Sequence, residues 1–333
     1  LVVNMRNDVD HLFFLCIMKT TISTLAIAFT IAASTLAASA QTKTAPLSNP
    51  DFNASVLVSS AFRNISKNYT KENCFISAYY KEVITKNDKA FSLNEAILDI
   101  DKASYLTSKP DKIAVKNVRV SNRPKMTDPF LVKLQGGPNT SLILDLAKYP
   151  FLGCEPSKIN DYYTFEYDTP VNIDNKLFYV VKFDQKYLGE DILFRGKLYI
   201  EAISHAIGKV EFAMNVEKRG DAYLNFVKDK PSYLNIDVKY ANYTVGYKEF
   251  NNKWLFEYSR SDVKFEAKNK KRGIFNEYLI SSKMVITKVN TPGVKIDKTN
   301  LMRSTDILAD RVQGGDDSLI WELYDELMLL ALL

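Results

Sequence analysis

Two glutamates on neighbouring predicted strands, Glu82 and Glu95, are the residues best placed to do chemistry in this chain. Residues 74–85 and 91–101 alternate between apolar and polar side chains, and the turn-forming residues 86–89 join them, so the pattern predicts a β-hairpin. With the turn centred on residues 87–88, position 82 faces position 93 and position 80 faces position 95. This register makes Glu82 and Glu95 diagonal neighbours on a face that is otherwise apolar.

The two carboxylates require partners, because an ionised group in an apolar setting is costly unless it is paired. Arg119 or Arg195 on later strands could supply the partner, and Tyr80 lies on the same predicted face. The functional interpretation is a general acid/base pair or an anchor for a cationic ligand. The structural interpretation is a polar network that fixes the strand register, or a solvent-facing surface, since a one-residue slip exchanges the faces.

Several other chemistries are excluded by the few histidines and cysteines. Beyond a predicted N-terminal signal only His205, Cys74 and Cys154 remain, so a His-rich or four-cysteine zinc site is impossible. A Ser-His-Asp mechanism would have to use His205, which lies in a predicted tight strand connection at residues 203–208. We therefore expect no catalytic set, no metal and no cofactor. Whether Cys74 and Cys154 pair is left open by the sequence.

Residues 18–40 indicate where the protein works. Met18 and Lys19 precede a charge-free apolar run at residues 22–36, and Ala38-Ser39-Ala40 follows. This is the secretory pattern, and it predicts cleavage before Gln41 and export to the periplasm or to the outer-membrane-associated envelope. The apolar run is shorter than the ~20 residues of a membrane span, and we expect no transmembrane span in the mature chain. Residues 1–17 are interpreted as an upstream extension from a start placed too early.

The charge pattern does not indicate a nucleic-acid partner. The net charge of +5 comes from lysines spread along the chain. The one dense basic patch, residues 268–272, is short and lacks interleaved aromatic side chains, so it is expected to cap a hairpin.

Hydrophobic periodicity predicts a mainly β fold. We expect a helix from Asn49 as N-cap to about Asn68, then a long antiparallel meander that forms a curled sheet or half-barrel, with a short inserted helix at residues 140–148. The predicted strands are residues 74–85, 91–101, 112–120, 162–167, 177–183, 196–201, 209–216, 233–247, 253–260, 262–267 and 278–289.

The predicted organisation is a linker at residues 41–50, a β half-barrel domain at 51–290 and a tail at 291–333. The tail has helical spacing of apolar residues over 316–333. We expect this tail helix to dock on the open side of the sheet as a lid over a pocket.

Several strings in the domain carry a family resemblance. They are residues 61–69, 79–82, 94–100, 133–138, 144–145 and 196–201, in that order. The chain resembles a group of Bacteroidetes cell-envelope proteins that usually carry a carboxypeptidase-regulatory-like domain ahead of this region, a domain for which residues 41–50 leave no room. The resemblance implies a curved antiparallel sheet similar to the half-barrel of periplasmic lipoprotein carriers.

Three functions remain open. The first is an exported, non-enzymatic envelope protein that binds a lipid, an acyl chain or a partner peptide on a concave sheet, with Tyr80, Glu82, Glu95, Arg119 and Arg195 as candidate binding residues. The second is a carboxylate-dependent hydrolase that uses Glu82 and Glu95. The third is a scaffold or assembly protein of the envelope that binds through the edges of its sheet. A large cavity lined by phenylalanines would favour the first, and a filled core with an open edge strand would favour the third.

Overall fold

The fold is described from a computed structural model of the chain. The described residues are 53–121, 133–134, 137–152, 154–186, 192–218, 222, 227–229, 232–290, 296–303, 306, 308–311, 321–322 and 324. They belong to the second of two compact units, Asn49–Leu333. The signal sequence, the upstream extension and the linker predicted at residues 1–50 lie outside the described residues.

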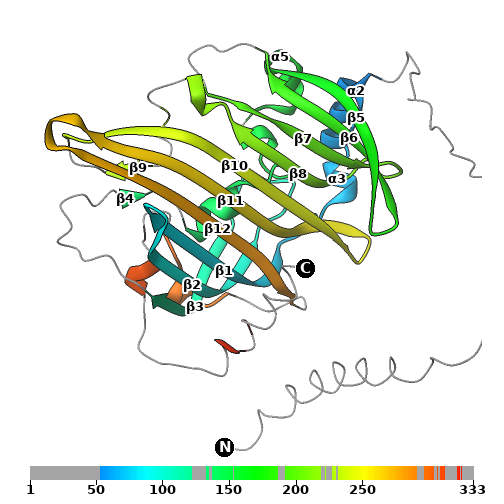
Figure 1. Cartoon of the computed structure of the whole chain (residues 1–333). Coiled ribbons are helices and arrows are strands. Elements are labelled where there is room, and N and C mark those ends of the chain that lie inside the picture. The colour runs from blue at the N-terminus through cyan, green and yellow to red at the C-terminus, as the bar shows by residue number, and fades with distance from the viewer. Residues whose placement is uncertain are drawn as a thin grey trace, which may run out of the picture. The chain divides into compact units, whose positions relative to one another are not determined.

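A ten-stranded antiparallel sheet dominates the structure (Figure 1), which confirms the predicted mainly β fold class. The sheet is open, and its edge strands β3 and β5 do not pair with each other. Its strands are β1 (Cys74–Lys86), β2 (Lys89–Lys102), β3 (Lys112–Ser121), β5 (Tyr163–Ile173), β6 (Lys176–Gln185), β7 (Phe194–Glu201), β8 (Ile207–Met214), β10 (Asn235–Phe250), β11 (Lys253–Asn269) and β12 (Ile274–Val289). A separate pair is formed by β4 (Lys133–Leu134) and β9 (Val227–Asp229).

The helices are short. The α-helices are α2 (Ala54–Arg63), α3 (Ile65–Asn68), α4 (Pro138–Ile143) and α5 (Ile159–Tyr162). The 3₁₀ turns are η1 (Pro150–Leu152), η2 (Pro156–Lys158), η3 (Val216–Lys218), η5 (Lys270–Arg272), η6 (Lys298–Asn300) and η7 (Leu308–Arg311). None of the described helices has the length and apolar character needed to cross a membrane.

Tight turns of Asn and Asp join the long hairpins. Asn87 and Asp88 link β1 to β2 with φ values of 51° and 62°, and Asn251 and Asn252 link β10 to β11 with φ values of 51° and 59°. Both residues of a type I′ turn need positive φ, which Asn and Asp tolerate better than other non-glycine residues. The predicted two-residue turn at Asn251-Asn252 is confirmed.

The strand order differs from the predicted simple meander. The order across the sheet is β3-β2-β1-β12-β11-β10-β8-β7-β6-β5, so β1 pairs with β12 from the far end of the domain. β3 and β5, which a meander would place near each other, are the two edges of the sheet. Local alternation identifies strands, but it does not say which distant strand will cover a free edge.

Two predicted strands are a single element. Residues 253–260 and 262–267 form one continuous strand, β11, whose ladder with β12 runs without a break from Tyr258 to Asn269. At the position of the predicted break, Ser261 and Asp262 bond across strands, because Ser261 Oγ lies 2.9 Å from Ser282 Oγ and Ser281 Oγ donates to Asp262 at 2.6 Å.

One face of the sheet, here called the core face, packs against the helices and holds the main hydrophobic core. The helix α2 contributes Leu57, Val58, Ala61 and Phe62 to this core at helical spacing. The predicted cap Asn49 lies outside the described residues, and the N-cap observed is Asn53, whose side chain accepts from the Ser55 N–H. The opposite side of the sheet is called the outer face.

The inserted helix is shorter than predicted. α4 ends at Ile143, because Asp145 turns its side chain inward and accepts a hydrogen bond from the Lys148 N–H at 3.2 Å. Such a local bond between side chain and backbone competes with helix continuation. The chain then passes through Phe151, a buried ring at φ 45° that packs 4.3 Å from the ring of Tyr163.

Candidate functional site

The structure places Glu82 and Glu95 on opposite faces of the sheet, so they are not neighbours. The β1–β2 ladder has a bulge between Ile84 and Thr85 that shifts the register by one residue, and Glu82 pairs with Asn94 while Glu95 pairs with Lys81. The predicted pairing of positions 82 and 93 was therefore wrong. A shift of one residue exchanges the faces of a strand, and it separates the two carboxylates.

Glu95 lies on the outer face, where its partner is Arg119, one of the two arginines that the sequence left open. Arg119 Nε donates to Glu95 at 2.7 Å, the Tyr79 hydroxyl donates to the same carboxylate, and Lys81 Nζ lies 3.6 Å away. Burial opposes the charge of Glu95, but the hydrogen bonds of Arg119 and Tyr79 outweigh it and lower its pKa. The Trp321 ring covers the Arg119 guanidinium at 4.6 Å.

Tyr80 and Glu82 lie together on the core face. The Tyr80 hydroxyl donates to Glu82 at 2.9 Å, and Asn94 Nδ2 donates to the other carboxylate oxygen at 3.0 Å. Burial, followed by the charge of Glu82, raises the pKa of Tyr80 far above its usual value. The three side chains form a local polar network between β1 and β2, and Glu95 is not part of it.

Arg195 lies away from both glutamates. It lines a groove across the outer face of β5, β6, β7, β8 and β10. Its guanidinium donates to Asn215 at 3.0 Å and pairs with Glu217, so it meets neither predicted glutamate. The groove has a volume of about 740 Å³. It is lined by Thr164, Glu166, Lys182, Phe183, Asp184, Arg195, Gly196, Lys197, Glu211, Phe212, Ala213, Asn242, Tyr243 and Thr244.

The charges of the groove are balanced. Three cationic side chains face three carboxylates in its lining, and further pairs lie at its border. Asp168 lies 2.9 Å from Lys197 and 3.3 Å from Lys182, and the Lys197 contact followed by the Thr169 N–H lowers the pKa of Asp168 to about 2. Such a surface suits a ligand that carries both charges and many hydrogen-bonding groups, and it suits a purely apolar or purely anionic ligand poorly.

The groove begins at a free sheet edge. In the part of the chain that the structure describes, β5 pairs with β6 alone. Every second residue of such an edge directs its N–H and C=O outward, which is a template for another strand. Pro170 and the irregular pairing between Asp168 and Val171 disrupt the second half of β5, and the first half is regular. The exposed rings of Tyr162 and Tyr167 flank that regular half.

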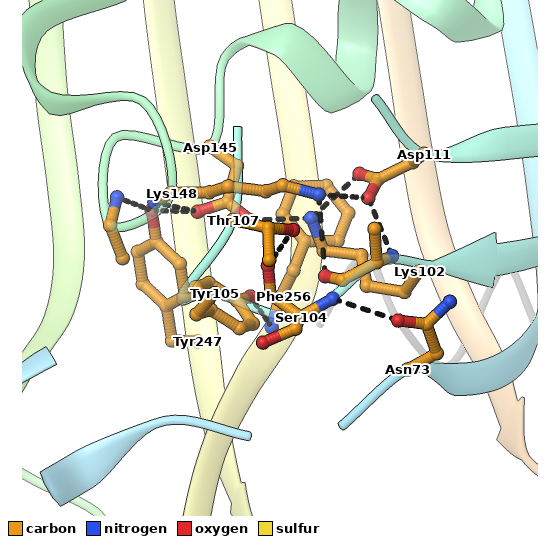
Figure 2. Close-up of polar contacts among 12 residues, drawn as sticks. Asn73, Lys102, Ser104, Tyr105, Thr107, Asp111, Asp145, Lys148, Tyr247 and Phe256 are labelled. Carbon is orange, nitrogen blue, oxygen red and sulfur yellow. Dashed lines mark hydrogen bonds and ion pairs between the residues drawn. The ribbon is translucent and has the colours of Figure 1, made fainter. Parts of the chain in front are cut away.

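A cluster of four ions, Lys102, Asp111, Asp145 and Lys148, is buried on the core face, and sequence reasoning missed it (Figure 2). Lys102 Nζ lies 2.8 Å from Asp111 and 2.7 Å from Asp145, and Lys148 pairs with Asp111. The Tyr247 hydroxyl donates to Asp145 at 2.9 Å. The cluster joins β2, the segment before β3, the inserted segment and β10.

Burial and the neighbouring charges shift the pKa values of the two lysines in this cluster in opposite directions. Burial alone would lower the pKa of Lys102, but the carboxylates of Asp145 and Asp111 outweigh it and raise that pKa above its usual value. Burial and then the charge of Lys102 lower the pKa of Lys148. Two cations and two anions cancel, so the cluster holds four elements together without a net buried charge.

One signal in the sequence could have indicated the cluster. Lys102 continues the alternation of Leu98 and Ile100, which are both buried in the core. A lysine in phase with core residues must find carboxylates inside the fold. Its partners Asp111 and Asp145 come from loops, where a sequence pattern gives no position.

The remaining candidates of the sequence analysis are structural. His205 lies in the β7–β8 connection at φ 58°, and its Nδ1 is 3.0 Å from Ser60 Oγ. Cys74 and Cys154 are free thiols. Among the described residues, no group of three or more His, Cys, Asp or Glu side chains could hold a metal ion.

Trp321 and Tyr324, which belong to the predicted tail helix, do not cover the core face, whereas Met302 and Leu308 earlier in the tail are part of the main core. Trp321 packs with Tyr79 and Ile97, and the Tyr324 ring stacks on Tyr79 at 5.7 Å. These contacts lie on the outer face of β1 and β2, opposite the expected position of the lid. The rest of the helix predicted at residues 316–333 lies outside the described residues.

The chain has structural similarity to solved proteins but no match among protein families. No protein-family model matches the chain, and no curated protein matches its sequence. Among solved structures, an outer membrane lipoprotein-sorting protein domain from Vibrio parahaemolyticus is 9% identical with a TM-score of 0.33, over 73% of this chain and 95% of that one. A LolA-superfamily protein from Nitrosomonas europaea is 9% identical with a TM-score of 0.29, over 72% and 96%.

The Pseudomonas aeruginosa MucA/MucB complex also contains a similar chain. It is 10% identical, with a TM-score of 0.21, over 70% of this chain and 93% of that chain. TM-scores below 0.5 carry no inference about function, so the functional conclusion rests on the residues described above.

Proposed function

We propose that this chain is an exported, non-enzymatic protein of the cell envelope that binds an extended segment of a partner protein. The open edge of β5 next to the balanced outer-face groove is the observation that carries the proposal. The peptide adds as a strand to the regular half of β5, and its side chains enter the groove. The secretory pattern at residues 18–40 supports the envelope location.

The filled core face favours a peptide over a lipid or an acyl chain. The side chains of α2 and of the inserted segment, including Phe62, Leu142 and Phe151, pack into one core with the sheet. An apolar ligand on this face would have to displace them. Figure 1 shows the helices α2, α3 and α5 behind the sheet, and β5 at its end.

The positions of the two glutamates disfavour the hydrolase alternative. Glu82 and Glu95 lie on opposite faces of one sheet, so they cannot act on the same bond of one substrate. Each has local hydrogen-bond partners that account for its position.

Selection of peptides from a displayed random library against the purified chain tests this proposal. We expect extended peptides that bind saturably and slow hydrogen exchange in the β5 amides, because strand addition satisfies the free backbone groups. The double variant Arg195→Ala/Lys197→Ala should weaken such peptides roughly tenfold, because two charged contacts of the groove are lost.

The matched control is Lys248→Ala/Arg260→Ala, which removes two exposed cations of the same sheet that also pair with carboxylates. This control should bind like the unchanged chain. Equal binding by both double variants, together with unprotected β5 amides, would show the proposal to be wrong. Preferential binding of a fatty acid over every peptide would instead favour the apolar-ligand alternative.

A further inference from the structure

A second pocket, on another part of the molecule, contains cations that the proposed function does not use. It lies between the start of β3 and residues 298–303, 306 and 311, and its volume is about 720 Å³. The Met302 N–H donates to the Ile113 carbonyl at 2.8 Å, and Leu301 forms a bridge with Ala114, so this segment runs beside β3. The pocket is lined by Asp111, Lys112, Lys298, Thr299, Leu301, Met302, Arg303, Asp306 and Arg311.

Both acidic side chains of the lining are already neutralised. Asp111 pairs with the buried Lys102 and Lys148, and its side chain is only 2% exposed. Asp306 pairs with Arg311 and accepts a hydrogen bond from the Arg303 N–H at 2.8 Å. The Arg303 N–H and then Arg311 lower the pKa of Asp306, and the charge of Arg303 adds to this effect, but Arg303 forms no ion pair with this carboxylate.

Three cations of the lining remain, namely Lys112, Lys298 and Arg303. None of them forms an ion pair with a residue that the structure describes, and all three are exposed. The nearby carboxylate of Asp297 accepts from the Thr299 N–H at 2.9 Å and from Asn300 Nδ2 at 3.2 Å, so it caps its own turn. With four cations and two anions in the lining, the pocket carries a net charge of +2.

The buried four-ion cluster shares Asp111 with this pocket and neutralises the charge of that residue. Asp111 belongs to both, and the other cluster members are two lysines and one aspartate. The cluster has no net charge of its own, so Asp111 does not offset the exposed cations of the pocket. A concave cationic surface with low-dielectric walls attracts anions more strongly than isolated lysines in solvent do.

We propose that this pocket binds a multiply charged anion of the phosphate type, through Lys112, Lys298 and Arg303. An arginine and two lysines can together donate to several oxygens of one phosphate group, and such charge-assisted hydrogen bonds are stronger than neutral ones. The phosphate belongs either to a small soluble compound or to a lipid headgroup at a membrane surface. The groove at β5 is a separate surface, so this site does not depend on the proposed peptide binding.

Titration of the purified chain with inorganic pyrophosphate, followed by calorimetry, tests the site. We expect saturable binding that weakens as the salt concentration rises, because the contacts are ionic. The double variant Lys298→Ala/Arg303→Ala should weaken binding by about tenfold or more, because each lost charged hydrogen bond contributes to affinity. Both side chains are exposed, so the variant is expected to fold.

The matched control is Arg63→Ala/Lys89→Ala, which removes the same charge from exposed positions on α2 and at the start of β2. It should bind pyrophosphate like the unchanged chain. A second arm measures sedimentation with vesicles of phosphatidylcholine, with and without phosphatidylglycerol. Binding to the anionic vesicles that is lost in Lys298→Ala/Arg303→Ala assigns the phosphate to a headgroup, and binding of pyrophosphate alone assigns it to a soluble compound.

Two outcomes would overturn the proposal. One is the absence of saturable binding of both probes by the unchanged chain. The other is binding that falls equally in Lys298→Ala/Arg303→Ala and in Arg63→Ala/Lys89→Ala, because a general charge effect would then explain it.

Discussion

Two regions of the sheet hold ion pairs of nearly the same length in opposite surroundings. Lys102 lies 2.7 Å from Asp145 in the core, where both side chains are 0% exposed. Lys197 lies 2.9 Å from Asp168 beside the groove, where the side chains are 42% and 22% exposed. Distance alone would treat the two pairs as equal, but solvent screens the second pair and not the first.

The comparison teaches that burial, and not the distance between the charges, distinguishes the two ion pairs. The buried cluster around Lys102 uses charges to hold elements together, because a buried charge that loses its partner is strongly destabilising. The β5–β8 end leaves its charges in solvent, where they can exchange partners at little cost. A surface that must accept another molecule needs this second kind of charge.

The largest loss of stability is expected from removing one charge of the buried four-ion cluster. Lys102→Met should lower the free energy of unfolding by about 3–5 kcal/mol, because Asp145 then keeps a charge inside the core without its lysine. Urea unfolding at neutral pH measures this loss. Lys89→Met, at the exposed start of β2, is the control and should change stability little.

A second variant sharpens this expectation. Lys102→Met/Asp145→Asn removes both charges and keeps an acceptor for the Tyr247 hydroxyl. It should be more stable than Lys102→Met alone. If it is less stable, the cost comes from lost packing and not from an unpaired charge.

An intermediate effect is expected for Glu95, which is 1% exposed while its partner Arg119 is 32% exposed. Its pKa is lowered in the fold by Arg119 and Tyr79 against the effect of burial. The stability it contributes is therefore present above the unfolded pKa of about 4.3 and is lost as the pH falls through the folded pKa.

Glu95→Gln should lower stability by about 1–3 kcal/mol at pH 7, the range for hydrogen bonds to charged groups. The difference from the unchanged chain should shrink at pH values below about 4.3. Urea unfolding at both pH values measures it, with the exposed Glu72→Gln as control. A difference that is independent of pH would mean that the charge of Glu95 does not contribute.

The smallest change in stability is expected from removing a charge in the groove. Lys197→Ala should change the free energy of unfolding by less than about 1 kcal/mol, because the pair is exposed and Asp168 keeps Lys182 at 3.3 Å. Thermal unfolding at low and high salt measures it. If Lys197→Ala lost as much stability as Lys102→Met, the exposed ion pair would contribute as much as the buried one, and the comparison would be wrong.

The sequence by itself located the ten strands of the sheet, although it divided β11 into two strands and ended β5 at residue 167 instead of Ile173. Strict alternation, as in Val210 and Phe212 of β8, predicts strands because successive side chains point to opposite faces. Asn251 and Asn252 predict a tight turn because they tolerate positive φ. Strand alternation and tight turns depend only on residues that are close in the sequence, so they can be predicted from one sequence.

Only the tertiary structure decided which faces and which distant segments come together. The bulge at Ile84 and Thr85 placed Glu82 and Glu95 on opposite faces, and the pairing of β1 with β12 made β5 an edge. The cluster around Lys102 gathers residues from four separate elements. A one-residue shift or a long-range strand pairing leaves local periodicity unchanged, and the packing of the whole chain selects among the alternatives.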